Sequence, residues 1–318
     1  MTGTPAPRRP SAWLVILGKL AVTGAALAWA FSRTSVDAML SAVRALSPGA
    51  GALAVGLGVL NLAVGALRFR DVLAAYGLSP LPPFAFLFHG YLVASFYNTF
   101  VPGNVGGDAL RAHTARAAFG SPADAYVAVI LERGLGVSAL FVVSGLAAFG
   151  TRGVPSFAPP LLLGTGVVLT ALSFGGPAIL ERLARFLPRR FAAALDGLTV
   201  PRPSAPLLRS FLWSVATQIL SVLAAHVLLS DLAPEVTLRD SLALVPLAML
   251  SIYVPVSLLG LGLREAAFVV LFGRIGVPAN VATAGSLAFM ASLMTIAALG
   301  GIAHALKPLE LPATGARS

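Results

Sequence analysis

Six charged side chains in this sequence lie within or beside strongly apolar segments, and their types and spacing could support chemistry. Acidic and basic residues occur close together at three places, which gives the candidate set Asp108, Arg111, Glu132, Arg133, Arg264 and Glu265. A guanidinium is permanently charged, and its planar array of donors suits a phosphate bidentately. Carboxylates beside arginines can hold them in position or select a cationic group. The set therefore predicts a site that binds an anionic group.

Glycine and proline interrupt the chain immediately before the first of these pairs. The segment 98–112, NTFVPGNVGGDALRA, places two glycines where a helix would begin with Asp108. A helix start offers free N–H groups and a partial positive charge, both of which suit a bound anion. In a plainer interpretation, Asp108 is an N-cap that pairs with Arg111 one turn on. The expected backbone breaks in this segment are Pro102, Gly106 and Gly107.

A second segment, 251–265 with the sequence SIYVPVSLLGLGLRE, resembles the first at a constant offset of 153 residues. Five of the fifteen positions are identical, among them Pro102 with Pro255 and Arg111 with Arg264. The expected breaks in the second segment are Pro255, Gly260 and Gly262. We therefore predict an internal repeat, with a first half at about 12–150 and a second half at about 160–306.

The composition places these residues in a membrane protein. Hydrophobic residues make up 57% of the 318-residue chain and charged residues 11%, whereas a soluble domain has about 25% charged residues. Long apolar runs, rather than short alternating ones, favour helices over a barrel. We predict one all-α polytopic membrane domain over 1–318, with about six full transmembrane helices and two inverted broken or re-entrant helical hairpins. The full spans are expected at 12–31, 48–67, 125–149, 160–180, 207–230 and 280–306.

Basic residues set the expected orientation in the membrane. The arginine-rich segment 181–206 is expected on the cytoplasmic surface, as an amphipathic helix or as a loop. Arg8 and Arg9 place the N-terminus on the same side, and Lys307 and Arg317 place the C-terminus there too. Counting the spans between these basic segments then makes region 83–120 enter from the cytoplasmic face and region 241–276 from the outer face. Broken segments inverted in this way are typical of transporters with a midplane site, so we expect a cavity between the two hairpins.

Charges buried in a membrane are costly, and they usually face a polar interior and mark function. Glu132 and Arg133 lie within a predicted span, and adjacent helical side chains point in different directions, so they do not simply neutralise one another. Our hypothesis is that all six candidates form one set across both hairpins. The alternative is a structural ion network that holds the hairpins in place.

Other polar residues have plainer interpretations. Arg68, Arg70 and Asp71 at the end of the second span are expected to be orientation signals, with contact to lipid headgroups as the lesser alternative. The remaining polar side chains within apolar segments are expected in helix–helix contacts. These residues are Asn61, His89, Asn98, Gln218, His226 and Ser257.

The sequence also argues against several kinds of chemistry. The chain has no cysteine and its four histidines lack metal-ligand spacing, so we expect no metal and no other cofactor. Lys and Arg outnumber Asp and Glu by 22 to 12, which membrane orientation and anionic lipids explain without a nucleic-acid partner. No Walker-type nucleotide-binding motif is present.

Three elements in order, FVPGNVGGDALRA, AVILERGLG and PVSLLGLGLREAAFVVLFGRIGVP, resemble the lysylphosphatidylglycerol synthase transmembrane region, also called the flippase-like family. The resemblance implies a multi-pass inner-membrane protein that moves or handles lipids. Relatives include the membrane half of enzymes that make aminoacylated phosphatidylglycerol. Because this sequence stops eight residues after Glu310, we expect a standalone member without the soluble aminoacyl-transferring domain, and synthase activity is not carried over.

The resulting expectation is a lipid flippase, in which Arg111 and Arg264 bind an anionic headgroup in the cavity while the acyl tails stay in the membrane. One alternative is a non-catalytic membrane partner of lipid-biosynthesis enzymes. Another is a membrane-embedded transferase in which Asp108 or Glu132 acts as general base. Membrane lipids with anionic headgroups are the expected partners, and passive or ion-coupled movement is the expected mode.

Overall fold

The structure is a computed structural model that describes residues 37, 41, 44–100, 106–119, 122–184, 201, 204–253 and 262–309. All regular secondary structure in these residues is helical, which confirms the predicted all-α class. Five of these helices are long and apolar enough to cross a membrane. They are α3 (Pro48–Ala75), α6 (Pro122–Ala148), α7 (Ala158–Ala184), α9 (Ala205–Leu232) and α12 (Ala279–Leu306).

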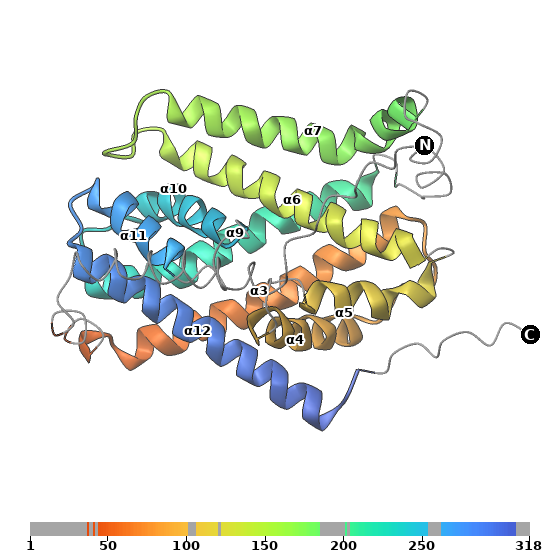
Figure 1. Cartoon of the computed structure of the whole chain (residues 1–318), viewed down its shortest axis with the longest axis horizontal. Helices are drawn as coiled ribbons and strands as arrows, with labels where there is room; N and C mark the ends of the chain where they lie inside the picture. The colour runs from red at the N-terminus through yellow and green to blue at the C-terminus, as the bar shows by residue number, and fades with distance from the viewer. Residues whose placement is uncertain are drawn as a thin grey trace, which may run out of the picture.

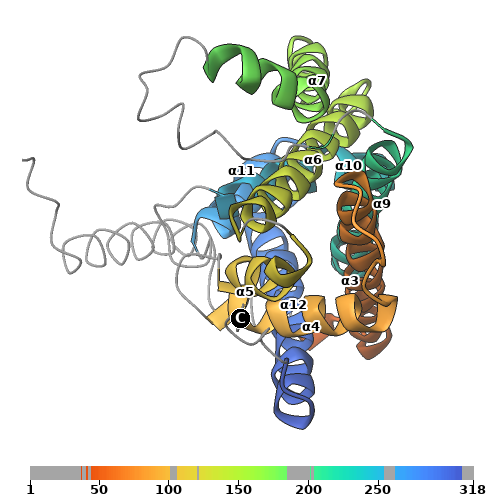
Figure 2. The same ribbon diagram turned by 90° about the vertical axis from the view of Figure 1, so that its right-hand side faces the viewer.

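These five helices coincide with five of the predicted full spans, so the chain is a multi-pass membrane protein. The predicted first span, 12–31, lies outside the described residues, as does most of the basic segment 181–206. Helix α7 lies at the edge of the bundle against α6 (Figure 1 and Figure 2). Several large apolar side chains of this helix are exposed, for example Leu161 and Val167, as expected of a helix that faces lipid.

Local sequence explains where two of the helices begin. At α3, the Ser47 hydroxyl accepts a hydrogen bond from the Ala50 N–H (3.2 Å), and a proline occupies the first helical position. At the helix α10, Leu238–Met249, Thr237 and Asp240 each accept a bond from the other's backbone N–H (3.2 and 3.0 Å). This reciprocal capping box satisfies donors that the helix itself leaves unpaired.

Helices α3 and α9 pack side by side in antiparallel directions, and polar contacts connect them along their length. The contacts join Ser47 to Asp231 (3.0 Å), Asn61 to Ser221 (2.6 Å) and Asp71 to Arg209 (2.8 Å). Residue numbers rise along α3 as they fall along α9, so the end of α3 lies beside the start of α9. Asn61 also donates to the Thr217 carbonyl (3.0 Å), which confirms its predicted role in helix–helix contact.

Each predicted broken region forms a pair of shorter helices. The first pair is α4 (Phe84–Phe100) and α5 (Gly106–Ala115), followed by the 3-10 turn η1 (Arg116–Ala118). The second is α10, continued by the 3-10 turn η2 (Leu250–Tyr253), and α11 (Leu263–Gly273). The breaks themselves, with Pro102, Pro255 and Gly260, lie outside the described residues.

The two pairs lie toward opposite ends of the bundle (Figure 1). The first pair connects the end of α3 to the start of α6, whereas the second connects the end of α9 to the start of α12. Because α3 and α9 are antiparallel, these attachment points lie at opposite ends. The span count leads to the same expectation of opposite membrane faces. The internal repeat, which is an independent argument from the sequence, stays a prediction.

The first helix pair depends on a close approach between α4 and α5. The Gly107 N–H donates to the Asn98 side-chain oxygen (2.8 Å). A Cβ atom at Gly107 would collide with the Ala94 carbonyl, so this position of α5 fits a residue without a side chain. Gly106 is the first residue of α5, as expected of the glycines that precede Asp108.

Candidate functional site

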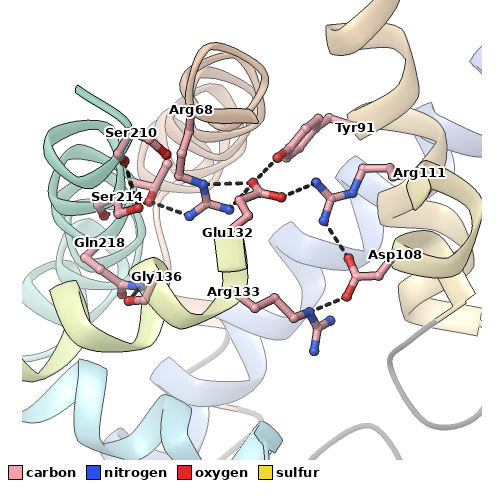
Figure 3. A network of polar contacts seen from close by, with 11 residues as sticks. Arg68, Tyr91, Asp108, Arg111, Glu132, Arg133, Gly136, Ser210, Ser214 and Gln218 are labelled. Carbon is pink, nitrogen blue, oxygen red and sulfur yellow. Dashed lines mark hydrogen bonds and ion pairs between the residues drawn. The ribbon is translucent and has the colours of Figure 1, made fainter. Parts of the chain in front are cut away.

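Glu132, in the middle of α6 and fully buried, is the centre of the polar site (Figure 3). Arg68 of α3 donates to its Oε1 through Nε (2.8 Å) and Nη2 (2.6 Å). Arg111 of α5 donates to its Oε2 through Nη1 (2.7 Å), and the Tyr91 hydroxyl of α4 also donates to Oε1. One carboxylate thus joins side chains from α3, α4 and α5 to α6.

Asp108 is the second carboxylate of the site. Its Oδ1 accepts from Arg111 Nη2 (2.6 Å), and its Oδ2 forms an ion pair with Arg133 Nε of α6. The local pairing with Arg111 agrees with the plainer interpretation, but Asp108 is the third residue of α5 and not its N-cap. Glu132 and Arg133 have different partners, as their adjacency on one helix predicts.

Aromatic rings hold the Arg111 guanidinium from both helices that flank it. Its central carbon lies 4.3 Å from the centroid of the Tyr91 ring and 5.4 Å from that of the Phe69 ring. Cation–π attraction strengthens where the cation is desolvated, and this arginine side chain is 9% exposed. Ion pairs and rings together therefore fix the direction of the Arg111 guanidinium.

The site carries more positive than negative charge. Three guanidinium groups and two carboxylates form it, which leaves one formal positive charge in excess. The Arg133 side chain is 32% exposed, against 14% for Arg68 and 9% for Arg111. Arg133 is therefore the guanidinium most accessible to a molecule entering the site.

A cavity of about 400 Å³ lies against this cluster, and Arg68, Asp108, Arg111 and Arg133 form part of its wall. This volume falls in the range of about 300–1,000 Å³ that ligand pockets usually have. Amide and hydroxyl side chains of α3, α4, α9 and α12 line other parts of it. They are Asn61, Ser95, Asn98, Thr99, Thr217, Gln218, Ser221 and Ser292. The helix bundle therefore has an open cavity whose wall combines charged and polar side chains with apolar ones such as Leu62 and Phe289, and we call it the polar cavity.

Arg264 and Glu265 lie apart from this cavity, in a second network at the start of α11. Both are fully buried, and Arg264 Nη2 donates to Glu265 Oε1 (2.5 Å). Ser286 of α12 accepts from Arg264 Nε (3.1 Å) and donates to Glu265 Oε1 (3.2 Å). The other carboxylate oxygen accepts from the N–H of Gly262, whose φ of 79° is one that glycine adopts readily (2.6 Å).

Among the described residues, the six side chains predicted to form one set across both helix pairs therefore make two networks of contacts that share no partner. Glu265 turns back to cap the start of α11, which brings its carboxylate to the neighbouring guanidinium and makes a neutral pair. The cavity also differs from the expected one between the two hairpins. Among the described residues that line it, Met249 is the contribution of the second helix pair.

Two members of the cluster were missed by the sequence interpretation. Arg68 was expected to be an orientation signal, yet it donates both bonds described above to Glu132. A usable signal was its spacing of seven residues from Asn61, because residues two turns apart share one face of a helix. Tyr91 had no such signal. Its ring fits beside α3 because Gly65 has no side chain there.

Several plainer interpretations are confirmed. Gln218 donates to the Gly136 carbonyl (3.1 Å), and a ring nitrogen of His226 lies 2.9 Å from the Ser241 hydroxyl. Asn98 joins α4 to α5, as described above, and Ser257 lies outside the described residues.

Within the described part of the chain, no group of three or more His, Asp or Glu side chains could hold a metal ion. The expectation that the protein binds no metal stays a prediction.

Comparison with known proteins places this architecture in a family context. A family model described as the lysylphosphatidylglycerol synthase TM region matches residues 16–300 of the chain. The match covers both helix pairs and the whole polar cluster. A search of curated proteins found no match.

Proposed function

The chain belongs to the lysylphosphatidylglycerol synthase transmembrane family, whose membrane domains are linked to lipid modification or flipping, and on this premise we propose that it is a lipid flippase. A lipid with an anionic headgroup crosses the cytoplasmic membrane with its headgroup in the polar cavity, while its acyl tails remain in the hydrocarbon region. The positively charged cluster on the cavity wall is the observation that supports this proposal.

Arg133 makes the first contact with the headgroup, because it is the most exposed of the three guanidinium groups. A phosphate diester carries one negative charge, which matches the excess positive charge of the cluster. The phosphate competes with Asp108 for Arg133, and a guanidinium can bind two phosphate oxygens at once. Glu132 remains paired with Arg68 and Arg111 and keeps both in position.

The cavity lowers the cost of moving a polar headgroup through hydrocarbon. Transfer of an unpaired polar or charged group from water into hydrocarbon costs several kcal/mol or more of free energy. Hydroxyl and amide side chains on the other walls replace water as partners for headgroup oxygens and hydroxyls. Movement driven by the lipid gradient or coupled to ions fits a sequence without a nucleotide-binding motif.

The geometry gives less support to a transferase. Each carboxylate of the cluster accepts hydrogen bonds or ion pairs from at least two cationic or phenolic partners. Both oxygens of each carboxylate face these partners, so neither Asp108 nor Glu132 presents an oxygen to a substrate proton as a general base would. A non-catalytic partner of lipid-biosynthesis enzymes is distinguished by the following experiment, because it would not move lipid by itself.

The test is transbilayer movement of fluorescent phosphatidylglycerol and phosphatidylcholine in liposomes that contain the purified protein. We expect wild-type protein to accelerate the anionic probe above protein-free vesicles. Arg133→Gln should slow that movement at least tenfold, whereas the same change at exposed Arg152, in the loop after α6, should leave it unchanged. Wild-type rates equal to those of empty vesicles with both probes would refute the proposal.

A further inference from the structure

A second, mostly apolar cavity of about 140 Å³ shares a wall with the polar one. Tyr91 and Arg111 line both cavities. The other walls of the small cavity come from the end of α3, the first half of α4, the end of α5 and the residues that follow α5. Its apolar lining includes Phe69, Leu73, Phe86, Leu87 and Ala118. Polar and apolar spaces thus meet at one arginine and one tyrosine.

Gly90 of α4 shows that this volume is open space inside the protein. The residue is buried, yet a Cβ atom added to it would meet no atom within 4 Å. Protein interiors are close-packed, so a buried helical position normally contacts its neighbours. At Gly65 and Gly107, on the adjoining surfaces of α3 and α5, an added Cβ would clash. The lack of a side chain at Gly90 therefore leaves a volume that an apolar group can fill.

The small cavity also reaches the outer surface of the bundle. Phe86, which lines it, is 40% exposed, and Phe84, the first residue of α4, is 41% exposed. Large exposed apolar side chains on a membrane domain face the acyl chains of the bilayer. The edge of the small cavity at Phe86 therefore lies at the apolar surface of the bundle, beside the acyl chains of the bilayer.

We propose that this cavity holds the first part of one acyl chain of the same lipid whose headgroup occupies the polar cavity, so that only the rest of that chain and the second chain remain in the hydrocarbon region. This inference rests on the proposed function and narrows its substrate to anionic lipids whose acyl chain begins close to the phosphate. An apolar cavity of about 150 Å³ accommodates a benzene molecule, so the space suits about six carbon atoms. Arg111 and Tyr91 mark the boundary between the phosphate and the chain.

Two water-soluble probes separate the headgroup from the chain. Dihexanoylphosphatidylglycerol has both parts, whereas glycerophosphoglycerol has the same singly charged phosphate diester headgroup without acyl chains, and each can be titrated against the purified full-length protein. We expect wild-type protein to bind the lipid probe at least tenfold more tightly than glycerophosphoglycerol. Gly90→Leu fills the small cavity and should weaken binding of the lipid probe at least tenfold, with binding of glycerophosphoglycerol unchanged.

The matched control is Gly164→Leu on α7, an exposed glycine whose added Cβ also meets no atom within 4 Å. It should bind both probes as wild type does. A second measurement fills the cavity after the protein has folded, so it does not depend on folding of the leucine variant. Since the chain has no native cysteine, a single introduced cysteine can be modified specifically. Gly90→Cys, purified and then modified with hexyl methanethiosulfonate, should lose binding of the lipid probe only after modification.

The outcomes distinguish this inference from the function on which it rests. If wild-type protein binds neither probe, the proposed function fails and the acyl site with it. If wild type binds both probes equally, or if filled Gly90 variants bind the lipid probe as wild type does, the acyl site is refuted and the headgroup site stands. An equal loss of binding of both probes in the filled variants also refutes the acyl site, because filling a site for the acyl chain should not weaken binding of the headgroup.

Discussion

Replacing Glu132 with glutamine should destabilise the folded protein strongly, because this buried carboxylate is the shared partner of two guanidinium groups. Glutamine keeps the shape of the side chain but removes its charge. The excess positive charge of the cluster then rises from one to two. Removing one partner of a buried ion pair costs about 3–5 kcal/mol of unfolding free energy, mainly because the other charge stays buried without compensation.

The expected shift in melting temperature follows from this cost. An unfolding entropy of about 2.1 cal/mol/K per residue amounts to about 0.67 kcal/mol/K for the 318 residues of this chain. A loss of about 3–5 kcal/mol then lowers the Tm of Glu132→Gln by about 4–7 °C. The measurement is the fraction of protein that remains monodisperse by size-exclusion chromatography after heating in detergent, at one fixed lipid and salt composition.

A second substitution tests whether the cost comes from the stranded arginine. Arg68→Met removes the guanidinium that donates two bonds to Glu132 and keeps a long apolar side chain in its place. The double variant with Glu132→Gln has the same excess charge as wild type, so it should melt at a higher temperature than Glu132→Gln alone. Coupling of this kind between contacting residues usually amounts to about 0.5–3 kcal/mol.

The control for the single variant is Glu235→Gln, the same chemical change at an exposed residue between α9 and α10. Surface substitutions of this kind usually change the unfolding free energy by less than about 0.5 kcal/mol. A Tm of Glu132→Gln within about 2 °C of this control would correspond to a small change in unfolding free energy. The carboxylate would then not stabilise the cluster. A double variant no more stable than Glu132→Gln would show that the stranded charge is not the cause.

Two further substitutions test the helix pairs. Gly107→Ala forces a methyl group against the Ala94 carbonyl, so we expect a loss of about 1–3 kcal/mol and a lower Tm, whereas an unchanged Tm would contradict the close packing of α4 on α5. Glu265→Gln should cost about 3–5 kcal/mol because it leaves Arg264 buried without its anion, yet binding of glycerophosphoglycerol by protein that remains folded should be unchanged. Weaker phosphate binding in that variant would contradict this separation and indicate that Arg264 and Glu265 contribute to the headgroup site.

The positions of the spanning helices could be predicted from the sequence because the requirement is local. Each helix needs about 20 consecutive apolar residues to cross the hydrocarbon, and five predicted spans coincide with helices of the structure. The glycines before Asp108 likewise predicted a helix start, since backbone approach and helix capping depend on neighbouring residues. The family could be recognised for the same reason, from three short motifs in order.

The partners of the charged residues depended on which helix faces meet, and hydropathy does not contain that information. Lipid tails are as apolar as leucine, so the lipid-facing and protein-facing sides of a spanning helix look alike. Arg68 and Glu132 are 64 residues apart, and the packing of α3 against α6 and α9 brings them into contact. A repeat in the sequence grouped Arg264 with this cluster, whereas the structure packs it against Ser286 of α12.

The sequence by itself therefore determined that this is a helical membrane protein, where most of its spans lie, and that Glu132 and Arg133 serve different partners. These properties follow from chain-local hydrophobicity and helical geometry. The tertiary structure decided that Arg68 and Tyr91 complete the cluster, that Arg264 and Glu265 neutralise each other elsewhere, and that a polar and an apolar cavity meet at Arg111. Those properties arise from contacts between helices that are distant in the chain.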